Sequence, residues 1–194
     1  MNAERDSMPT GRGLAGKFLI AMPGLQDGQF EKTVLFVCTH NKEGALGLVI
    51  NQPHIADMSE VLTPLGLEWG RPERPIVYQG GPVAPDRGFM LYEADLHYPG
   101  HVRICEHVYL GTNPEILRYL VQSRDHGRFL FALGYSGWAS GQLETELRDN
   151  VWLVGGLDRT LLFDLPVDAR WDAAIRLLGI DPLHLIDPGR GLIN

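Results

Sequence analysis

The stretch that decides the fold is GYSGWASGQLE, residues 134–144. An apolar run, Phe129 to Leu133, leads into it, and Leu147 to Trp152 leads out. Short apolar runs bounded by turn residues favour strands, and clustered glycines mark turns. The stretch therefore predicts a strand, a glycine-rich turn that carries an exposed aromatic, a short polar helix and another strand. We expect the rest of the chain to be arranged around this unit.

Strands are predicted mainly in the first part of the chain, with helices interspersed among them. Apolar, β-rich runs predict strands at residues 18–21, 33–38, 45–50, 76–78, 89–92, 102–110 and 151–154. Capping patterns predict helices that begin at Asp57, Thr112 and Asp168. Because these strands and helices do not alternate strictly, we expect an α+β domain with a mixed sheet and not a doubly wound fold.

The length of the chain bounds its organisation. Its 194 residues suffice for one domain with a sizeable core. Residues 1–13 are polar, and residues 181–194 hold two prolines and two glycines. We therefore predict a flexible N-terminal tail over residues 1–13, a single domain over residues 14–180 and an irregular C-terminal tail over residues 181–194.

The balance of charges disfavours some classes of partner. Seventeen Lys and Arg against 24 Asp and Glu give a net charge of −7, which opposes non-specific binding to nucleic acid or anionic membranes. The first 12 residues lack the apolar segment of a signal peptide. No apolar run approaches the roughly 20 residues that span a bilayer. Two cysteines cannot form a dense disulfide framework, so the simplest expectation is a soluble cytoplasmic protein.

Ser136 invites comparison with the nucleophile elbow G-x-S-x-G, but Trp138 stands where the motif needs a small residue. We therefore expect Ser136 to bond to backbone, and we predict no catalytic residue. Gly80 and Gly81 are not followed by the lysine of a phosphate-binding loop. They fit a bulge or tight turn, or a bare backbone that a ligand approaches closely. No cofactor is predicted.

Two Cys-x-His pairs, Cys38-x-His40 and Cys105-x-His107, form a candidate metal site. On a strand, residues i and i+2 face the same side about 7 Å apart, and thiolates and imidazoles are zinc ligands. If the two pairs lay on adjacent strands, they would complete a Cys₂His₂ site. The competing interpretation, which we favour, is that the cysteines are small buried apolar residues. These four residues are therefore only alternative candidates for metal binding.

Trp138 has two interpretations. As a large residue that is usually buried, it would cover the core as a lid; alternatively, it is exposed and contacts a partner. On the helix that follows, Glu144 and Glu146 are two residues apart and point to different sides, so they form no catalytic carboxylate pair. Glu144 is expected to pair instead with Arg148, four residues further on.

Spaced blocks along the chain form a distinctive set. Besides the stretch 134–144, they are FLIAMPGL (18–25), Thr33-Val34, CTHN (38–41), EGALGLVINQP (43–53), GGPV (80–83), DRGF (86–89), Asn150 and Trp152. With these blocks, residues 16–179 resemble the uncharacterised bacterial YqgE/AlgH family. Thr39 departs from the glutamate that the family usually carries there, which weakens any role for an acidic group at that position.

The resemblance implies a fold but little about function. The family's fold is a single α+β domain built on coiled, bifurcated β-sheets with helices packed outside. The family has no established enzymatic activity, and one member is named for regulation of alginate synthesis, from which a transcriptional-regulator label follows. This chain shows no helix-turn-helix pattern, and its acidity opposes direct DNA contact. A regulatory effect would be indirect, through a protein or small-molecule partner.

Three hypotheses of function follow, with a non-enzymatic binding or regulatory protein first. Its candidate ligand- or partner-binding residues are His40, Asn51, Gly80, Gly81, Arg87, Trp138, Gln142 and Glu144. The rival is an enzyme or ligand-binding protein for a small anionic metabolite. There Arg87 and glycine amides would hold the anion, and Glu144 or His40 would be the base. The third is a DNA-binding regulator, which the charge disfavours. The partner and the oligomeric state are left open.

Overall fold

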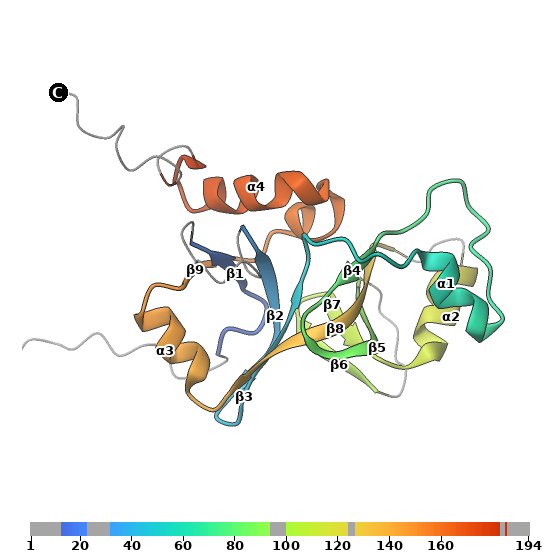
Figure 1. The fold of residues 1–194 in the computed structure, drawn as a ribbon, viewed down its shortest axis with the longest axis horizontal. Coiled ribbons are helices and arrows are strands. Elements are labelled where there is room, and N and C mark those ends of the chain that lie inside the picture. The colour runs from blue at the N-terminus through green and yellow to red at the C-terminus, as the bar shows by residue number, and fades with distance from the viewer. Residues whose placement is uncertain (1–12, 23–31, 94–99, 124–126, 183–184, 186–194) are drawn as a thin grey trace, which may run out of the picture.

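The computed structural model describes residues 13–22, 32–93, 100–123, 127–182 and 185. Within these residues a nine-stranded sheet carries four α-helices (Figure 1). The strands are β1 (Phe18–Ala21), β2 (Val34–Asn41), β3 (Gly44–Val49), β4 (Val77–Gln79), β5 (Val83–Tyr92), β6 (His101–Cys105), β7 (Val108–Gly111), β8 (Phe129–Ala139) and β9 (Trp152–Gly155). The helices are α1 (Met58–Leu62), α2 (Pro114–Gln122), α3 (Gln142–Arg148) and α4 (Arg170–Leu177), with the short turns η1 (Thr63–Leu65), η2 (Thr160–Asp164) and η3 (Val167–Ala169). Most of the two predicted tails lies outside the described residues.

The sheet divides at β8. The first half of this strand pairs antiparallel with β5 on one side and parallel with β4 on the other. Its second half pairs antiparallel with β3. The strand order is β6-β7-β5-β8-β3-β2-β1-β9, with β4 attached to β8 outside this path. The expected α+β class and the mixed, bifurcated sheet are confirmed, and α3 and α4 lie on the side of the division opposite to α1 and α2 (Figure 1).

The predicted glycine-rich turn is wrong, because β8 runs without interruption from Phe129 to Ala139. Gly134 instead allows the backbone at Gly81 to lie close to β8. A Cβ on Gly134, whose φ is +72°, would lie 2.4 Å from the carbonyl oxygen of Gly81. A Cβ on Gly81, whose φ is +151°, would lie 2.3 Å from the carbonyl carbon of Tyr135. Only glycine tolerates both this contact and a positive φ, so these residues let the β4–β5 link lie against β8.

The run 102–110 is not one strand but the hairpin of β6 and β7. Its two-residue turn is Glu106-His107, and His107 has a φ of +58°. The expected alternation of side chains between Cys105 and His107 therefore ends at the turn. In β2, a register shift between Val37 and Thr39 also interrupts the alternation.

The predicted helices are found, with two of their starts displaced. The capping box of Asp57 and Glu60 begins α1 as predicted. The N-cap of α2 is Asn113 and not Thr112, because Pro114 occupies the first helical turn and Asn113 Oδ1 accepts the Glu115 N–H at 2.9 Å. A 3₁₀ turn follows Pro166, so α4 begins at Arg170 and not after Asp168. Among the described residues, no helix is long and apolar enough to cross a membrane.

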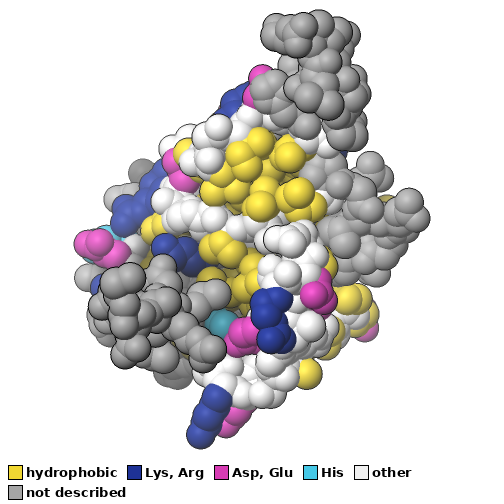
Figure 2. Space-filling model, turned by 90° about the vertical axis from the view of Figure 1, so that its left-hand side faces the viewer, with side chains coloured by type: hydrophobic (Ala, Val, Ile, Leu, Met, Phe, Trp, Pro, Cys, Tyr) yellow, Lys and Arg dark blue, Asp and Glu magenta, His cyan; other side chains and the backbone are white. Residues whose placement is uncertain are grey.

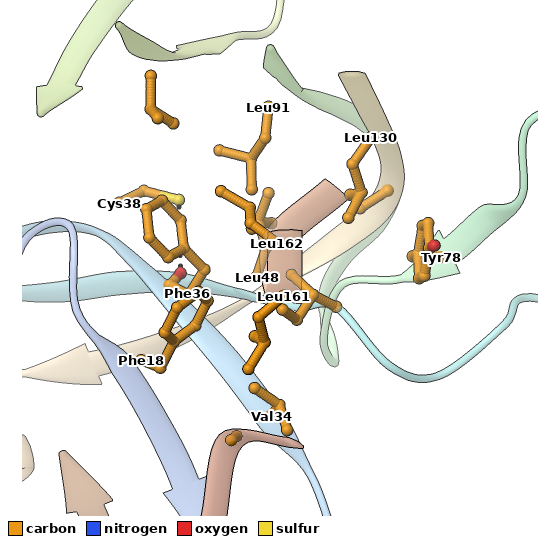
Figure 3. Close-up of a cluster of buried hydrophobic side chains, with 14 of the residues drawn as sticks. Phe18, Val34, Phe36, Cys38, Leu48, Tyr78, Leu91, Leu130, Leu161 and Leu162 are labelled. Atoms are coloured by element: carbon orange, nitrogen blue, oxygen red, sulfur yellow. Dashed lines mark hydrogen bonds between the residues drawn. The ribbon is translucent and has the colours of Figure 1, made fainter. Parts of the chain in front are cut away.

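Three clusters of buried apolar side chains hold the elements together. Figure 3 shows part of the largest, which lies between the sheet and α4 and in which the rings of Phe18 and Phe36 are 5.3 Å apart. The second cluster lies beneath α1 and α2, and the third lies beneath α3. Figure 1 shows α3 at one end of the molecule and α1 with α2 at the other. Candidate residues occur at both ends.

Candidate functional site

The structure does not bring the eight candidate residues into one surface. Four meet where α3 packs against β3 and β8, three make backbone contacts just after β3 or between β4 and β5, and one lies at the opposite end of the molecule. These groups are, in turn, His40, Trp138, Gln142 and Glu144; Asn51, Gly80 and Gly81; and Arg87.

His40 is fixed at both ring nitrogens. Its Nδ1 accepts the Leu14 N–H at 3.0 Å, so the proton of the neutral ring lies on Nε2 and is donated to Glu144 Oε1, also at 3.0 Å. Among the described residues, Glu144 does not pair with Arg148 as predicted; Arg148 donates instead to the Thr145 hydroxyl at 2.9 Å. Because both nitrogens are engaged, the ring offers no free lone pair to a ligand.

Glu146 is a residue that sequence analysis missed. Its Oε2 accepts the indole N–H groups of Trp138 and Trp152, each at 2.7 Å. Its Oε1 accepts the Gln142 amide at 2.9 Å. The two indole rings meet edge to face with centroids 6.4 Å apart. A buried indole N–H needs an acceptor, and this need of the two tryptophans is the signal that could have pointed to Glu146.

Trp138 and Gln142 both serve the packing of α3. Trp138 is 8% exposed and lies in the cluster beneath α3, so it covers the core and is not the exposed aromatic of the first prediction. Gln142 Oε1 accepts the Ala139 N–H at 3.0 Å. This bond connects α3 to the end of β8, at a helix start where Gly141 supplies no side-chain cap.

The surface at this end of the molecule is shown in Figure 2, which views the side that carries α3 and β9. Apolar side chains gather there in areas bordered by charged ones. β9 is the outermost strand on this side of the sheet, and its Val154 is 39% exposed.

The candidates Asn51, Gly80 and Gly81 are engaged in contacts with the backbone. Asn51 Oδ1 accepts the Val34 N–H at 2.8 Å, and Asn51 Nδ2 donates to the Lys32 carbonyl at 2.8 Å, so this amide continues the bonding of the sheet beyond β3. The Gly80 N–H donates to Leu133 at 2.8 Å, and the Gly80 carbonyl accepts from Val49 at 2.9 Å. The space beside Gly80 and Gly81 is filled by β8. Ser136 Oγ donates to the Gly80 carbonyl at 3.3 Å, as expected of a hydroxyl that bonds to backbone.

The four candidate metal ligands do not assemble into one site among the described residues. Burial raises the pKa of the Cys38 thiol, and the nearby Cys105 thiol raises it further. Burial also raises the pKa of Cys105, although Arg159 and Arg103 oppose this shift. His40 is bonded to Glu144 and His107 lies in an exposed turn. No group of three or more potential ligands that could hold a metal ion occurs in the described part of the chain.

Arg87 lies at a groove between two helices. The groove has a volume of about 420 Å³ and is bounded by α1 and η1 on one side and α2 on the other, with β5 and β8 beneath. Its lining residues are Ala56, Glu60, Val61, Pro64, Leu65, Asp86, Arg87, Gly88, Met90, Thr112, Pro114, Leu117, Phe131 and Leu133. We call it the α1–α2 groove. Leu117, Met90 and Phe131 are each at most 3% exposed and belong to the cluster beneath these helices.

The Arg87 guanidinium at this groove has no carboxylate partner among the described residues. It lies over the Phe89 ring at 5.5 Å, and its Nη2 is 3.5 Å from the Thr112 hydroxyl, which is a long hydrogen bond. Two other cavities, of about 720 and 280 Å³, are lined by other residues. None of these three cavities is lined by His40 or Glu144, the two predicted bases. Neither residue therefore shares a cavity with Arg87, the predicted anion-binding residue.

Comparisons with known proteins agree with this fold. A model of the AlgH-like family matches residues 18–183. The UPF0301 protein of Magnetococcus marinus is 52% identical over 181 residues, which are 93% of this chain and 97% of that protein. The UPF0301 protein of Desulfotalea psychrophila is 42% identical over 178 residues, which are 91% of this chain and 94% of that one.

Two solved structures are also similar. The solution structure of the AlgH protein from Pseudomonas aeruginosa has a TM-score of 0.77 and 38% identity, and the match covers 97% of this chain and 100% of that one. The crystal structure of a protein from Corynebacterium diphtheriae has a TM-score of 0.67 over 92% of this chain and 93% of that one. At 20% identity the second match supports the fold alone.

Proposed function

The chain belongs to the AlgH-like family, and from this membership and the geometry above we propose that it is a non-enzymatic binding or regulatory protein whose partner enters the α1–α2 groove. The observation that carries the proposal is the groove itself, with an apolar floor and the unpaired Arg87 guanidinium at its mouth.

The floor supports binding of an apolar group. Leu117, Met90 and Phe131 form its buried part, and Val61 and Leu65 add half-buried walls. Its volume of about 420 Å³ falls in the range of roughly 300–1,000 Å³ that is common for small-molecule sites. Apolar surface covered there contributes about 2.5 kcal/mol for each ~100 Å² removed from water, before the entropic costs of association.

The chemistry of the lining supports binding and not catalysis. Among the described residues, the lining holds no histidine, cysteine, serine or lysine. Its Glu60 side chain accepts the Asp57 N–H at 2.9 Å in the capping box of α1. A nucleophile paired with a base, which covalent catalysis requires, is not assembled in the described lining of this groove. His40 and Glu144, the predicted bases, are engaged with each other elsewhere.

The regulatory part of the proposal is an indirect effect. A net charge of −7 opposes contact with DNA phosphates. Any effect on gene expression would therefore be indirect and would depend on whether a partner occupies the groove. The cytoplasm is the proposed compartment, because the two cysteines are free and reduced thiols persist in the cytosol.

The test uses 1-anilinonaphthalene-8-sulfonate, which combines apolar rings with an anionic group. Val61→Gln places a polar side chain in the groove wall and should weaken dye binding by about tenfold, or about 1.4 kcal/mol. The matched control is Val102→Gln on β6, a 46% exposed valine outside the groove lining. Equal dye binding by the two variants, with unchanged far-UV and near-UV circular dichroism, would remove the groove as the binding site.

A further inference from the structure

Two opposite charges share the α1–α2 groove without being paired. Asp86 and Arg87 are adjacent on β5, both are exposed, and both line the groove. Among the described residues neither side chain forms an ion pair, and their charged atoms do not approach one another within the 4.0 Å of a salt bridge. Asp86 and Arg87 therefore present one anion and one cation to the groove, and neither is ion-paired with the other or with another described side chain.

The backbone explains how consecutive strand residues line one groove. In a regular strand, neighbouring side chains point to opposite faces. In β5, however, Val83 pairs with Tyr135 while Gly88 pairs with Leu133, so four residues of β5 lie opposite a single residue of β8. Ala84, within this irregular segment, has a φ of +48°. Such a bulge ends the alternation and redirects side chains, which allows Asp86 and Arg87 to serve the same cavity.

The other charged groups near the groove make contacts of their own, although Glu60 has no cationic partner among the described residues. Glu60 accepts the Asp57 N–H of the capping box. Arg118, on α2, lies 3.5 Å from Glu115 and also contacts the Leu65 carbonyl at 3.5 Å. Of the described lining side chains, Glu60, Asp86 and Arg87 thus carry charges without an ion-pair partner, and Asp86 and Arg87 are the oppositely charged neighbours above the apolar floor.

We infer that the α1–α2 groove takes a small zwitterion of the amino-acid type, with an apolar side chain on a carbon that carries an ammonium and a carboxylate group. This inference rests on the proposed function and specifies its ligand class. The carboxylate pairs with the Arg87 guanidinium, whose planar fork suits carboxylates, and the ammonium pairs with Asp86. The apolar side chain lies over Leu117, Met90 and Phe131. A simple anion would pair with Arg87 but meet the Asp86 carboxylate, and a simple cation would pair with Asp86 but meet Arg87, so a ligand with both charges complements the site better than either.

The test compares four forms of one side chain by isothermal titration calorimetry with the full chain. L-phenylalanine carries both charges, N-acetyl-L-phenylalanine only the negative one, L-phenylalaninamide only the positive one, and N-acetyl-L-phenylalaninamide neither. We expect L-phenylalanine to bind about tenfold tighter than either singly charged form. If the uncharged form binds as tightly as the zwitterion, the ligand class is wrong and a segment within a peptide chain is the better occupant.

Variants that neutralise one charge at a time show which ligand group pairs with Asp86 and which pairs with Arg87. Asp86→Asn should abolish the preference for L-phenylalanine over its N-acetyl form, and Arg87→Gln should abolish the preference over the amide. Asp149→Asn and Arg176→Gln, at exposed positions outside the groove lining, should leave both preferences intact. If both dye and zwitterion fail to enter the groove, the proposed function falls together with this inference. If the dye enters and the four phenylalanine forms bind equally, only the ligand class is overturned.

Discussion

His40 and Glu144 are 104 positions apart in the sequence, and a hydrogen bond of 3.0 Å joins His40 Nε2 to Glu144 Oε1. The other nitrogen of the same ring accepts the Leu14 N–H. A side chain of β2 thus connects α3 to the turn that precedes β1. The ring in this arrangement connects the two segments through hydrogen bonds at both of its nitrogens.

Replacing His40 with alanine should remove both bonds. A part-buried hydrogen bond contributes about 1 kcal/mol, so the free energy of unfolding should fall by about 1–2 kcal/mol in urea denaturation. The Leu14 amide, which loses its acceptor, should exchange faster with deuterium. Glu144→Gln is the matched control, because its amide oxygen still accepts from Nε2, and it should cost less than about 0.5 kcal/mol. An unchanged exchange rate of Leu14 in His40→Ala would contradict the assigned contact.

Glu146 should matter more for stability than any other acidic residue of α3. Glu146→Leu leaves the indole N–H groups of Trp138 and Trp152 without their acceptor. An unsatisfied buried donor costs about 1–3 kcal/mol, so we expect the free energy of unfolding to fall by about 2–4 kcal/mol and tryptophan fluorescence to change. Glu43→Ala, at an exposed position in the β2–β3 turn, should change stability by less than about 0.5 kcal/mol. In a Trp138→Phe background, the cost of Glu146→Leu should be smaller; an equal cost would show that the Trp138 bond contributes nothing.

Features that depend on neighbouring residues could be predicted from the sequence. The capping box of α1 needs only Asp57 and Glu60, and both form the expected bonds. The hairpin of β2 and β3 likewise follows from two β-rich runs with a glycine between them. Local patterns were sufficient for these elements because their determining contacts lie within a few residues.

Features set by distant contacts could not be predicted. Gly134 suggested a turn, but it is required because Gly81 presses against β8 from a segment more than fifty residues earlier. The acceptor role of Glu146 depends on two indole groups from β8 and β9. The α1–α2 groove forms where α1, η1, α2, β5 and β8 meet, and the presence of both Asp86 and Arg87 in its lining depends on a bulge in β5 that local sequence does not reveal.

The buried thiol of Cys38 predicts a loss of stability in alkali. Burial, and then the Cys105 thiol, raise its pKa above the ordinary value of 9.0. Above about pH 9 the unfolded chain loses this proton while the native chain keeps it, so the unfolded state binds fewer protons and stability falls as pH rises. The slope approaches about 1.4 kcal/mol per pH unit for one such thiol, until the pH reaches its folded pKa.

Urea denaturation under reducing conditions at pH 8, 9 and 10 measures this slope. Cys38→Ala should lower stability at pH 8 because it removes a buried group, yet its stability should fall less steeply between pH 9 and 10 than that of the unaltered chain. Burial raises the pKa of Cys105 too, so part of the slope should remain in the variant. Parallel pH profiles for the two proteins would contradict the assignment to Cys38.

Arg170 is a buried cation that fastens α4 to the sheet. The residue is 2% exposed. Burial lowers the pKa of its guanidinium, whereas Tyr78 and Asp164 raise this pKa and so oppose part of the shift. Its Nε donates to the Leu165 carbonyl at 2.9 Å, its Nη1 donates to the Ile50 carbonyl, and its guanidinium lies 5.1 Å from the centre of the Tyr78 ring. One side chain therefore contacts the end of β3, β4 and the segment before α4.

Arg170→Met should lower the free energy of unfolding by about 3–5 kcal/mol, because the Ile50 and Leu165 carbonyls lose their donors while methionine restores only part of the packing. The matched control is Arg176→Met on the same helix, where a 65% exposed side chain lies 3.8 Å from Asp172. An exposed pair of this kind contributes about 0–1 kcal/mol, so the control should remain close to the unaltered chain in urea denaturation. If the two variants are equally stable, the apolar contacts of α4 alone hold it on the sheet. The unfavourable desolvation of the buried guanidinium would then cancel the favourable free energy of its hydrogen bonds.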